Sequence, residues 1–215
     1  MPENEHPARA TAAMRERGDG SEPAGAIGTA ALVGNRLIQF FDRDAVHVAR
    51  DLLGFHFMVG ETGGRIVETE AYRPDDEASH AFRGPTPRNG AMFGPPGNVY
   101  VYRSYGIHWC VNFVCKPGSA VLIRAVEPEN GLATMIERRS METLTLLCSG
   151  PGRLCQALGI DIGLNDRPLD YAPFSLTPAA PVEAVAGRRI GITKNTEAPW
   201  RFGVQGSRYL SKPMR

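Results

Sequence analysis

The sequence predicts an α+β fold: a single domain with a curved antiparallel β-sheet, flanking helices and a protruding β-hairpin. Two observations support this class. Segments with the alternating pattern of strands outnumber those with helical spacing, and the two kinds do not alternate as a parallel sheet would require. The length of 215 residues, of which 42% are hydrophobic, suits one domain with one core.

The first expected elements are a tail, a helix and a hairpin. Residues 1–35, rich in Ala, Gly, Pro and alternating charges, predict a flexible tail that precedes a domain over residues 36–215. Apolar residues at helical spacing predict a helix that begins at Asp44 as its N-cap and ends at Gly54. Strand patterns then flank a glycine-rich segment at residues 60–64, which is typical of a β-hairpin. Its two strands are expected at residues 55–59 and 65–71.

Strands dominate the rest of the chain. A loop rich in Pro and Gly leads to a second hairpin, with Tyr105 and Gly106 near its tip. Because proline is tolerated in the first turn of a helix, we expect a helix from about Pro128, and a later helix ends at Gly159. The expected strands are residues 99–102, 107–114, 120–126, 189–193 and 200–204. The expected helices are residues 128–139 and 153–158.

Targeting signals and cysteines indicate the compartment. No apolar run approaches the roughly 20 residues of a membrane span. The first residues lack the basic start and apolar stretch of an export signal, so we expect a cytoplasmic protein without a membrane partner. Four cysteines in such a chain predict reduced, buried thiols, and their spacing does not fit zinc binding, so we expect no metal and no cofactor. They are Cys110, Cys115, Cys148 and Cys155.

The net charge of +1 hides an uneven distribution. Residues 78–126 contain five basic side chains and no Asp or Glu. Cationic segments of this kind often bind phosphate groups, and arginine, which outnumbers lysine throughout, suits planar phosphate contacts. Neutralisation by acids elsewhere in the chain is an equally good explanation. The five basic residues are Arg83, Arg88, Arg103, Lys116 and Arg124.

Two acidic residues, Glu68 and Glu70, share one face of an expected strand, and His80 follows them closely. A carboxylate at a strand end can orient and deprotonate water, which hydrolysis of a glycosidic bond requires. Two acids on one face also fit the acid pair of carbohydrate hydrolases, which needs separations that the sequence does not show. For both acids, an ion pair with Arg124 is the structural alternative.

Three tyrosines cluster on the second hairpin. Tyr100 and Tyr102 share a strand face, and aromatic rings beside cations suit base stacking, which contributes roughly 1 to 3 kcal/mol per base. Cross-strand packing, for which tyrosine is well suited, is the structural alternative for these two residues. Tyr105 at the hairpin tip is more exposed than packing requires, and a protruding aromatic side chain can wedge between base pairs.

Several short motifs follow one another along the chain: RIVETEAY at 65–72, TPRN at 86–89, MF at 92–93, VYVY at 99–102, YG at 105–106, LIRAVEP at 122–128 and GPGRLCQAL at 150–158. In this order they closely resemble the alkyladenine (3-methyladenine) DNA glycosylase family. The resemblance is continuous from about Gln39 to the last strand, so it implies a DNA glycosylase domain over residues 36–215.

The resemblance assigns roles to individual residues. It implies that Glu70 is the general base that holds the attacking water, with help from Arg124, and that Glu68 is a structural acid. The choice of Glu70 over Glu68 rests on the family motif alone. The implied substrate-binding residues are Tyr72, His80, Tyr102 and Asn112, with Asn112 discriminating against purines that carry a 2-amino group. The expected DNA-binding residues are Tyr105, which intercalates from its hairpin, Arg88 and Arg103.

The implied activity is that of a monofunctional DNA glycosylase of base excision repair. It would flip alkylated or deaminated purines (the class of 3-methyladenine, 7-methylguanine and hypoxanthine) from double-stranded DNA and leave an abasic site. No lysine precedes Lys116, so Schiff-base lyase chemistry is not expected. The expected partner is double-stranded DNA containing damaged purines, bound by a monomer.

Two other classes of function fit part of the pattern. A DNA- or RNA-binding module without chemistry accounts for the cationic segment and the tyrosines. Such a module has no use for Glu70, because a carboxylate beside a phosphate-facing surface weakens binding. A small-molecule glycosidase or nucleosidase would use Glu68 and Glu70, and salt-sensitive affinity for duplex DNA would count against it.

Overall fold

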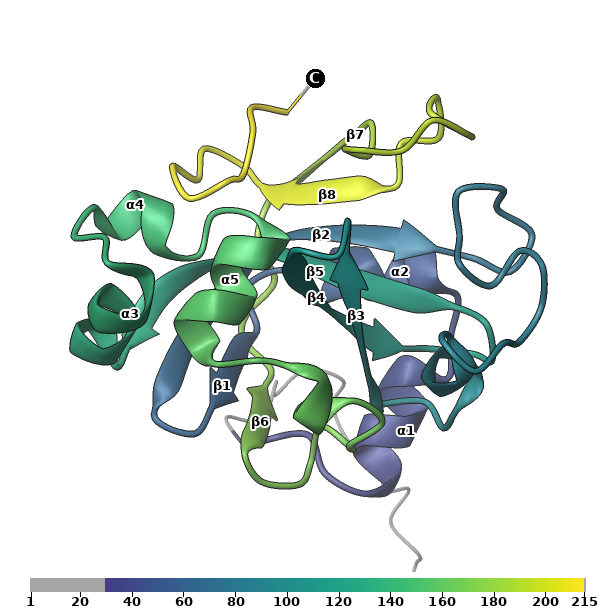
Figure 1. The fold of residues 1–215 in the computed structure, drawn as a ribbon, viewed down its shortest axis with the longest axis horizontal. Helices are drawn as coiled ribbons and strands as arrows, with labels where there is room; N and C mark the ends of the chain where they lie inside the picture. The colour runs from purple at the N-terminus through teal and green to yellow at the C-terminus, as the bar shows by residue number, and fades with distance from the viewer. Residues whose placement is uncertain (1–29, 215) are drawn as a thin grey trace, which may run out of the picture.

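A curved sheet of eight antiparallel strands forms the centre of the computed structural model, which describes residues 30–214 (Figure 1). Six strands follow the order β3-β4-β5-β2-β1-β6, and β8 pairs with both β2 and β7. The predicted α+β class with a curved antiparallel sheet is therefore confirmed. The strands are β1 (His56–Val59), β2 (Thr62–Tyr72), β3 (Val99–Ser104), β4 (His108–Val114), β5 (Ala120–Asn130), β6 (Phe174–Thr177), β7 (Ala184–Gly187) and β8 (Arg201–Val204).

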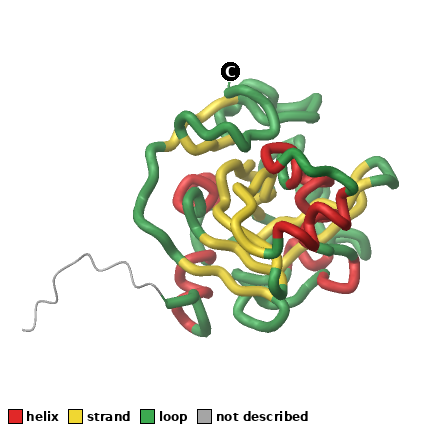
Figure 2. The backbone as a smooth tube through the Cα atoms, turned by 90° about the vertical axis from the view of Figure 1, so that its left-hand side faces the viewer, coloured by secondary structure: helices red, strands yellow, loops and turns green. Residues whose placement is uncertain are grey.

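Helices flank this sheet, and the side view shows loops around the C-terminus of the chain (Figure 2). Helix α5 packs against β4, whereas α2 packs against β2 (Figure 1). No helix in the described part of the chain is long and apolar enough to cross a membrane. The α-helices are α1 (Asn35–Phe41), α2 (Ala45–Asp51), α3 (Leu132–Arg139), α4 (Leu144–Leu147) and α5 (Pro151–Leu158). Two 3-10 helices are η1 (Gly90–Phe93) and η2 (Ile162–Leu164).

The tail predicted for residues 1–35 lies largely outside the described residues. Within them, Leu32 is buried and its N–H donates to the carbonyl of Leu176. The predicted N-cap of α2 is confirmed, since Oδ1 of Asp44 accepts a 2.8 Å hydrogen bond from the N–H of Val46. The four cysteines are free thiols and buried, as predicted.

The central strand β2 divides its side chains between two faces. Thr69 donates a 2.7 Å hydrogen bond to the carbonyl of Ala49 in α2, so its side chain points toward that helix. Glu68 and Glu70, one residue to either side, therefore point to the opposite face. The prediction that the two acids share one face is confirmed, because both contact the guanidinium of Arg124.

Arg124 reaches these acids through an irregularity in β5. Thr69 pairs with Ile123, whereas the preceding residue Glu68 pairs with Ala125, which leaves Arg124 as an extra residue opposite the step between them. Such a β-bulge bends the strand and redirects a side chain. An arginine in the middle of an apolar strand thereby lies beside both carboxylates.

The helix predicted over residues 128–139 is wrong at its start. Strand β5 continues to Asn130, and Pro128 pairs with Gly64 of β2. Proline is tolerated there because β4 pairs only with the first residues of β5, so no strand of residues 30–214 adjoins that edge near Pro128. Helix α3 begins only after Gly131, whose φ of 68° ends the strand.

Two further expectations differ from the structure. The strand expected at residues 189–193 is absent, because Arg189 lies in a loop and turns inward to an ion pair with Asp76. The first hairpin turns at Gly60 and Glu61, a shorter connection than the expected five residues, with β2 starting at Thr62. The sequence pattern also did not predict α1, α4, β6 and β7.

Candidate active site

A cleft of about 1490 Å³ is lined by the loop after β2, the β3–β4 hairpin, β5 and the start of α5. Eight of the nine site residues expected from the sequence line it, and the ninth, Glu70, lies directly behind this lining. The eight are Tyr72, His80, Arg88, Tyr102, Arg103, Tyr105, Asn112 and Arg124. The structure therefore brings together side chains that are spread over more than fifty positions of the sequence.

Glu70 is completely buried beneath the wall of the cleft. Its Oε1 accepts a 2.7 Å hydrogen bond from the N–H of Ile190 and lies 3.3 Å from Nη1 of Arg124. Its Oε2 accepts a 2.9 Å hydrogen bond from the hydroxyl of Tyr72. Burial raises the pKa of Glu70 above its ordinary value, although Arg124, the Ile190 N–H and the Tyr72 hydroxyl act in the opposite direction.

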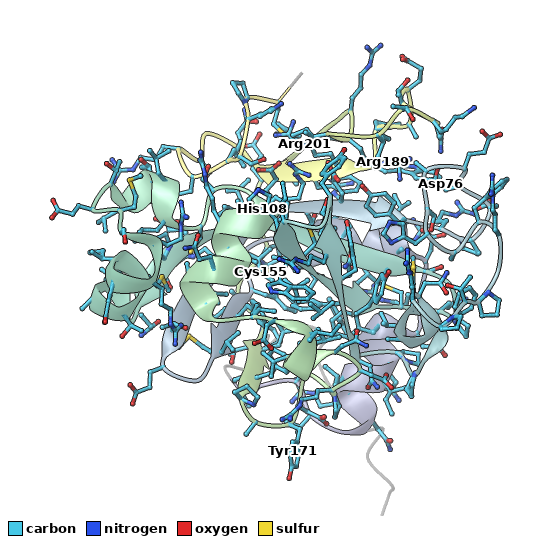
Figure 3. The ribbon with its side chains drawn as sticks, in the orientation of Figure 1. Asp76, His108, Cys155, Tyr171, Arg189 and Arg201 are labelled. Atoms are coloured by element: carbon cyan, nitrogen blue, oxygen red, sulfur yellow. The ribbon has the colours of Figure 1, made fainter. Side chains whose placement is uncertain are left out.

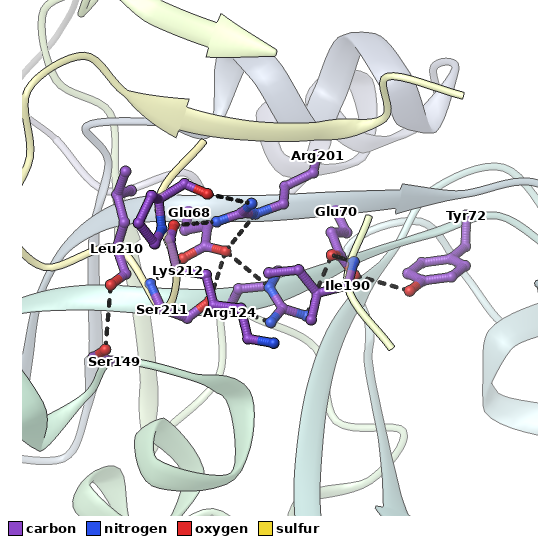
Figure 4. A network of polar contacts seen from close by, with 11 residues as sticks. Glu68, Glu70, Tyr72, Arg124, Ser149, Ile190, Arg201, Leu210, Ser211 and Lys212 are labelled. Carbon is purple, nitrogen blue, oxygen red and sulfur yellow. Dashed lines mark hydrogen bonds and ion pairs between the residues drawn. The ribbon is translucent and has the colours of Figure 1, made fainter. Parts of the chain in front are cut away.

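Glu68, the neighbouring acid on the same face, is also buried but contacts two arginines, whereas Glu70 contacts one (Figure 4). Oε1 of Glu68 accepts hydrogen bonds from Nε of Arg124 (2.9 Å), Nε of Arg201 (2.7 Å) and the hydroxyl of Ser211 (2.7 Å). Burial opposes its ionisation, but Arg124, the Ser211 N–H and Arg201 outweigh burial and lower its pKa. Two acids with pKa values pushed apart indicate different roles. The sequence spacing alone did not distinguish them.

Aromatic rings form another part of the cleft wall. His80 and Tyr102 meet edge to face with ring centroids 4.5 Å apart, and Tyr100 stacks on Tyr102 at 5.5 Å. The hydroxyl of Tyr100 lies 3.0 Å from Nδ1 of His80, and Nδ2 of Asn112 donates to the carbonyl of Tyr100. Partial desolvation lowers the pKa of His80. Tyr100 was not among the expected site residues, although the strand period placed it on the face of Tyr102.

The rim of the cleft carries the expected DNA-binding side chains. Tyr105 is 85% exposed at the tip of the β3–β4 hairpin, where it and Gly106 adopt positive φ angles of 51° and 68°. The guanidinium of Arg103 lies 5.5 Å from the ring centroid of Trp109, and Arg88 is exposed on the loop after β2. Positive φ is uncommon for a bulky residue and marks Tyr105 as part of a tight turn, where its side chain is exposed.

A buried ion pair between Arg189 and Asp76, which the sequence did not reveal, lies beside the ring of Tyr72. Arg189 pairs with Asp76, donates to the carbonyl of Ala71 and lies with Cζ 4.7 Å from the Tyr72 ring centroid (Figure 3). Both partners of the ion pair are fully buried. Because Arg189 directly precedes Ile190, the pair also fixes the loop whose N–H contacts Glu70. No sequence pattern links two residues that are 113 positions apart.

Comparisons with known proteins identify the family of this chain. The family described as methylpurine-DNA glycosylase matches residues 39–208. A relative from Rhizobium etli, provisionally named 3-methyladenine DNA glycosylase, is 70% identical over 92% of this chain and 99% of its own. Relatives with the same name from Agrobacterium fabrum and Nitrosospira multiformis are 61% and 56% identical, over 80% and 81% of this chain and 90% and 93% of their own. The chain therefore belongs to the methylpurine-DNA glycosylase family, whose members are DNA-repair enzymes that act on alkylated bases.

Proposed function

We propose that this DNA glycosylase excises alkylated and deaminated purines, the class of 3-methyladenine, 7-methylguanine and hypoxanthine, from double-stranded DNA. The damaged nucleotide rotates out of the duplex into the cleft, where its N-glycosidic bond is hydrolysed to leave an abasic site. One observation carries the proposal. A buried carboxylate of raised pKa, Glu70, touches two residues of the cleft wall, Tyr72 and Arg124.

The cleft wall fits a flipped purine. Tyr72, His80 and Tyr102 line the cavity, and stacking on aromatic rings contributes roughly 1 to 3 kcal/mol per base. An alkylated purine that carries a positive charge gains a further cation–π attraction. Asn112, whose Nδ2 is engaged by the Tyr100 carbonyl, serves to discriminate against purines with a 2-amino group.

Glu70 acts as the general base in this proposal. Its Oε2 accepts one hydrogen bond, from Tyr72, so a lone pair remains for a water O–H. Since Glu70 has no solvent exposure, water reaches it when the wall of the cleft opens around an entering nucleotide. Apo enzymes often adopt their catalytic contacts only when substrate binds.

The bond changes follow from these positions. The water oxygen bonds to the sugar C1′, its proton passes to Glu70, and the C1′–N bond breaks with its electron pair leaving on the purine. In an alkylated purine that pair neutralises the positive charge, whereas hypoxanthine must also gain a proton or hydrogen bond as it departs. Arg124 stabilises the ionised carboxylate beside the reacting atoms.

The proposed reaction is a hydrolysis without a Schiff-base intermediate, and side chains at the rim of the cleft bind the DNA. All three lysines of the chain fall within the described residues and none lines the cleft, which leaves no lysine for a Schiff base. Arg88 and Arg103 contact backbone phosphates, and Tyr105 enters the duplex where the base has left. We propose that the protein binds and cleaves its substrate as a monomer.

The experiment is base release from duplex oligonucleotides that contain 3-methyladenine or hypoxanthine. Under single-turnover conditions Glu70→Gln should slow release by about 100- to 10,000-fold, the contribution typical of a general base, while duplex binding persists. The matched control is Glu61→Gln, the same change at an exposed turn residue, and it should behave as wild type. Full activity of Glu70→Gln would overturn the assignment.

A further inference from the structure

The segment after β8 folds back over Glu68, the acid that is not the proposed general base. The N–H and hydroxyl of Ser211 donate to Oε2 and Oε1 of Glu68 at 2.5 and 2.7 Å. Arg201 donates to the carbonyls of Lys212 (2.5 Å) and Pro213 (3.3 Å), and its Nε bonds to Glu68 (Figure 4). A stretch without helix or strand is thus held by buried charged side chains.

Arg124 is shared unequally between the two acids. Its Nε donates to Oε1 of Glu68 at 2.9 Å, and its Nη2 donates to the Ser211 hydroxyl at 3.2 Å. Its contact with Glu70 is a single ion-pair distance of 3.3 Å from Nη1. One hydroxyl therefore bridges Arg124 and Glu68, donating to the carboxylate and accepting from the guanidinium.

The way Arg124 is shared affects the chemistry of Glu70. A carboxylate in a two-pronged arginine pair is strongly stabilised in its charged form and accepts a proton poorly. We propose that Ser211 is a positioning residue for hydrolysis: its hydroxyl holds the Arg124 guanidinium against Glu68 and prevents a two-pronged pair between Arg124 and Glu70. This inference rests on the proposed role of Glu70 as general base.

Several charged and titratable groups face Glu70, and of these Ser211 in the C-terminal segment contacts Glu68 and Arg124. Within the described residues they are Glu68 and Tyr72 on β2, Tyr102 on β3, Cys110 on β4 and Arg124 on β5. Arg124 alone among these donates to Ser211 and also contacts Glu70. Loss of the Ser211 hydroxyl therefore acts on Glu70 through Arg124, and closer pairing with the guanidinium lowers the pKa of Glu70.

The direction of the change follows from the role of a base. Glu70 must be ionised to accept a proton, so the rate falls at acid pH as Glu70 becomes protonated. In Ser211→Ala, this acid limb of the pH–rate profile should move to lower pH. The rate above it should fall by about 2- to 10-fold, the size expected for one hydrogen bond. Affinity for the duplex should not change, since Ser211 does not line the cleft.

The test compares single-turnover release of hypoxanthine from duplex DNA, from acidic to neutral pH, by variants of the full chain. The matched control is Ser207→Ala, because Ser207 lies in the same segment and its hydroxyl accepts from the Tyr209 N–H. Ser207→Ala should retain the wild-type profile, and Ser211→Thr, which keeps the hydroxyl, should restore it. Thermal melting checks folding, and Ser211→Cys, nearly equal in size, should shift the limb in the same direction if the alanine variant does not fold.

The outcomes separate this inference from the proposed function. An acid limb of folded Ser211→Ala that stays in place or moves to higher pH would overturn the positioning role, even if the rate falls. If Glu70→Gln is inactive in that case, the proposed function stands and this inference alone fails. Full activity of Glu70→Gln would remove the basis of both.

Discussion

The hydroxyl of Tyr72 donates a 2.9 Å hydrogen bond to Oε2 of Glu70. Burial, together with the charge of Glu70, raises the pKa of Tyr72 well above its ordinary value, so the phenol keeps its proton and remains a donor. Tyr72 lines the cleft and Glu70 does not, so the phenol separates the carboxylate from the cavity. The same contact stabilises the ionised form of Glu70 and covers it.

Tyr72→Phe should shift the acid limb of the pH–rate profile to higher pH. A hydrogen bond to the ionised carboxylate lowers the pKa of Glu70, and its removal raises that pKa further while the aromatic ring is kept. This shift is opposite to the one expected for Ser211→Ala. It is measured by single-turnover release of hypoxanthine over the same pH series.

Tyr100→Phe is the control for this change, because it removes a phenol that contacts His80 and does not contact Glu70. Its acid limb should remain where the wild type has it. A Tyr72→Phe limb that coincides with the wild-type limb would show that the Tyr72 hydroxyl does not tune the reacting carboxylate.

The sequence predicted the parts of the fold that depend on local patterns. Alternating residues identified both hairpins, and Asp44 marked the start of α2 through its side-chain oxygen. The end of β5 was misjudged because Pro128 is compatible with a first helical turn and with an unpaired strand edge, and only the neighbours of the strand decide between them. Helix α1 was missed because it is only seven residues long and lacks a side-chain cap.

The predictable parts of the site are those that a strand period or a motif identifies. Glu68 and Glu70 fall on one face by the two-residue period. The contacts that distinguish the two acids involve residues distant in the sequence. Arg124 reaches the acids through a β-bulge, and Ser211 lies more than 140 positions after Glu68. Register shifts and long-range hydrogen bonds leave no periodic signal in a single sequence.

Removal of the exposed Tyr105 ring should slow base release chiefly from duplex DNA. Tyr105→Ala should slow base release from a duplex by about 5- to 140-fold, because a stacked ring contributes roughly 1 to 3 kcal/mol and each 1.4 kcal/mol is a factor of ten. The loss should be smaller on single-stranded oligonucleotides, whose bases need less unstacking. Thermal stability should be unchanged, since the side chain is 85% exposed.

Tyr171→Ala is the matched control for the hairpin tip. Tyr171 is 67% exposed, as the outward side chain at the lower end of Figure 3 shows, and it does not line the cleft. Its replacement should leave release from both kinds of oligonucleotide at the wild-type rate. Equal losses on duplex and single-stranded substrates for Tyr105→Ala would contradict insertion of this ring into the duplex.

Removal of one charge from the buried Arg189–Asp76 ion pair should cause a large loss of stability. Asp76→Asn removes a buried negative charge and leaves Arg189 without its counter-ion, which should reduce the free energy of unfolding by roughly 3 to 5 kcal/mol. Glu197→Gln breaks the adjacent pair with Arg188, whose side chains are 65% and 73% exposed, and should cost at most about 1 kcal/mol. Denaturant unfolding at neutral pH measures both.

The same pair gives the stability difference a predictable dependence on pH. Burial opposes ionisation of Asp76, but hydrogen bonds from Arg189 and Asn195 outweigh it and hold its pKa below the ordinary value of 3.8. A carboxyl whose pKa is depressed in the folded state contributes its full stability above the unfolded pKa and loses that contribution as the pH falls through the folded value. The difference between wild type and Asp76→Asn should therefore be constant near neutrality and shrink in acid. A difference that grows as the pH falls would mean that Asp76 is protonated in the folded protein and that Arg189 is balanced by another group.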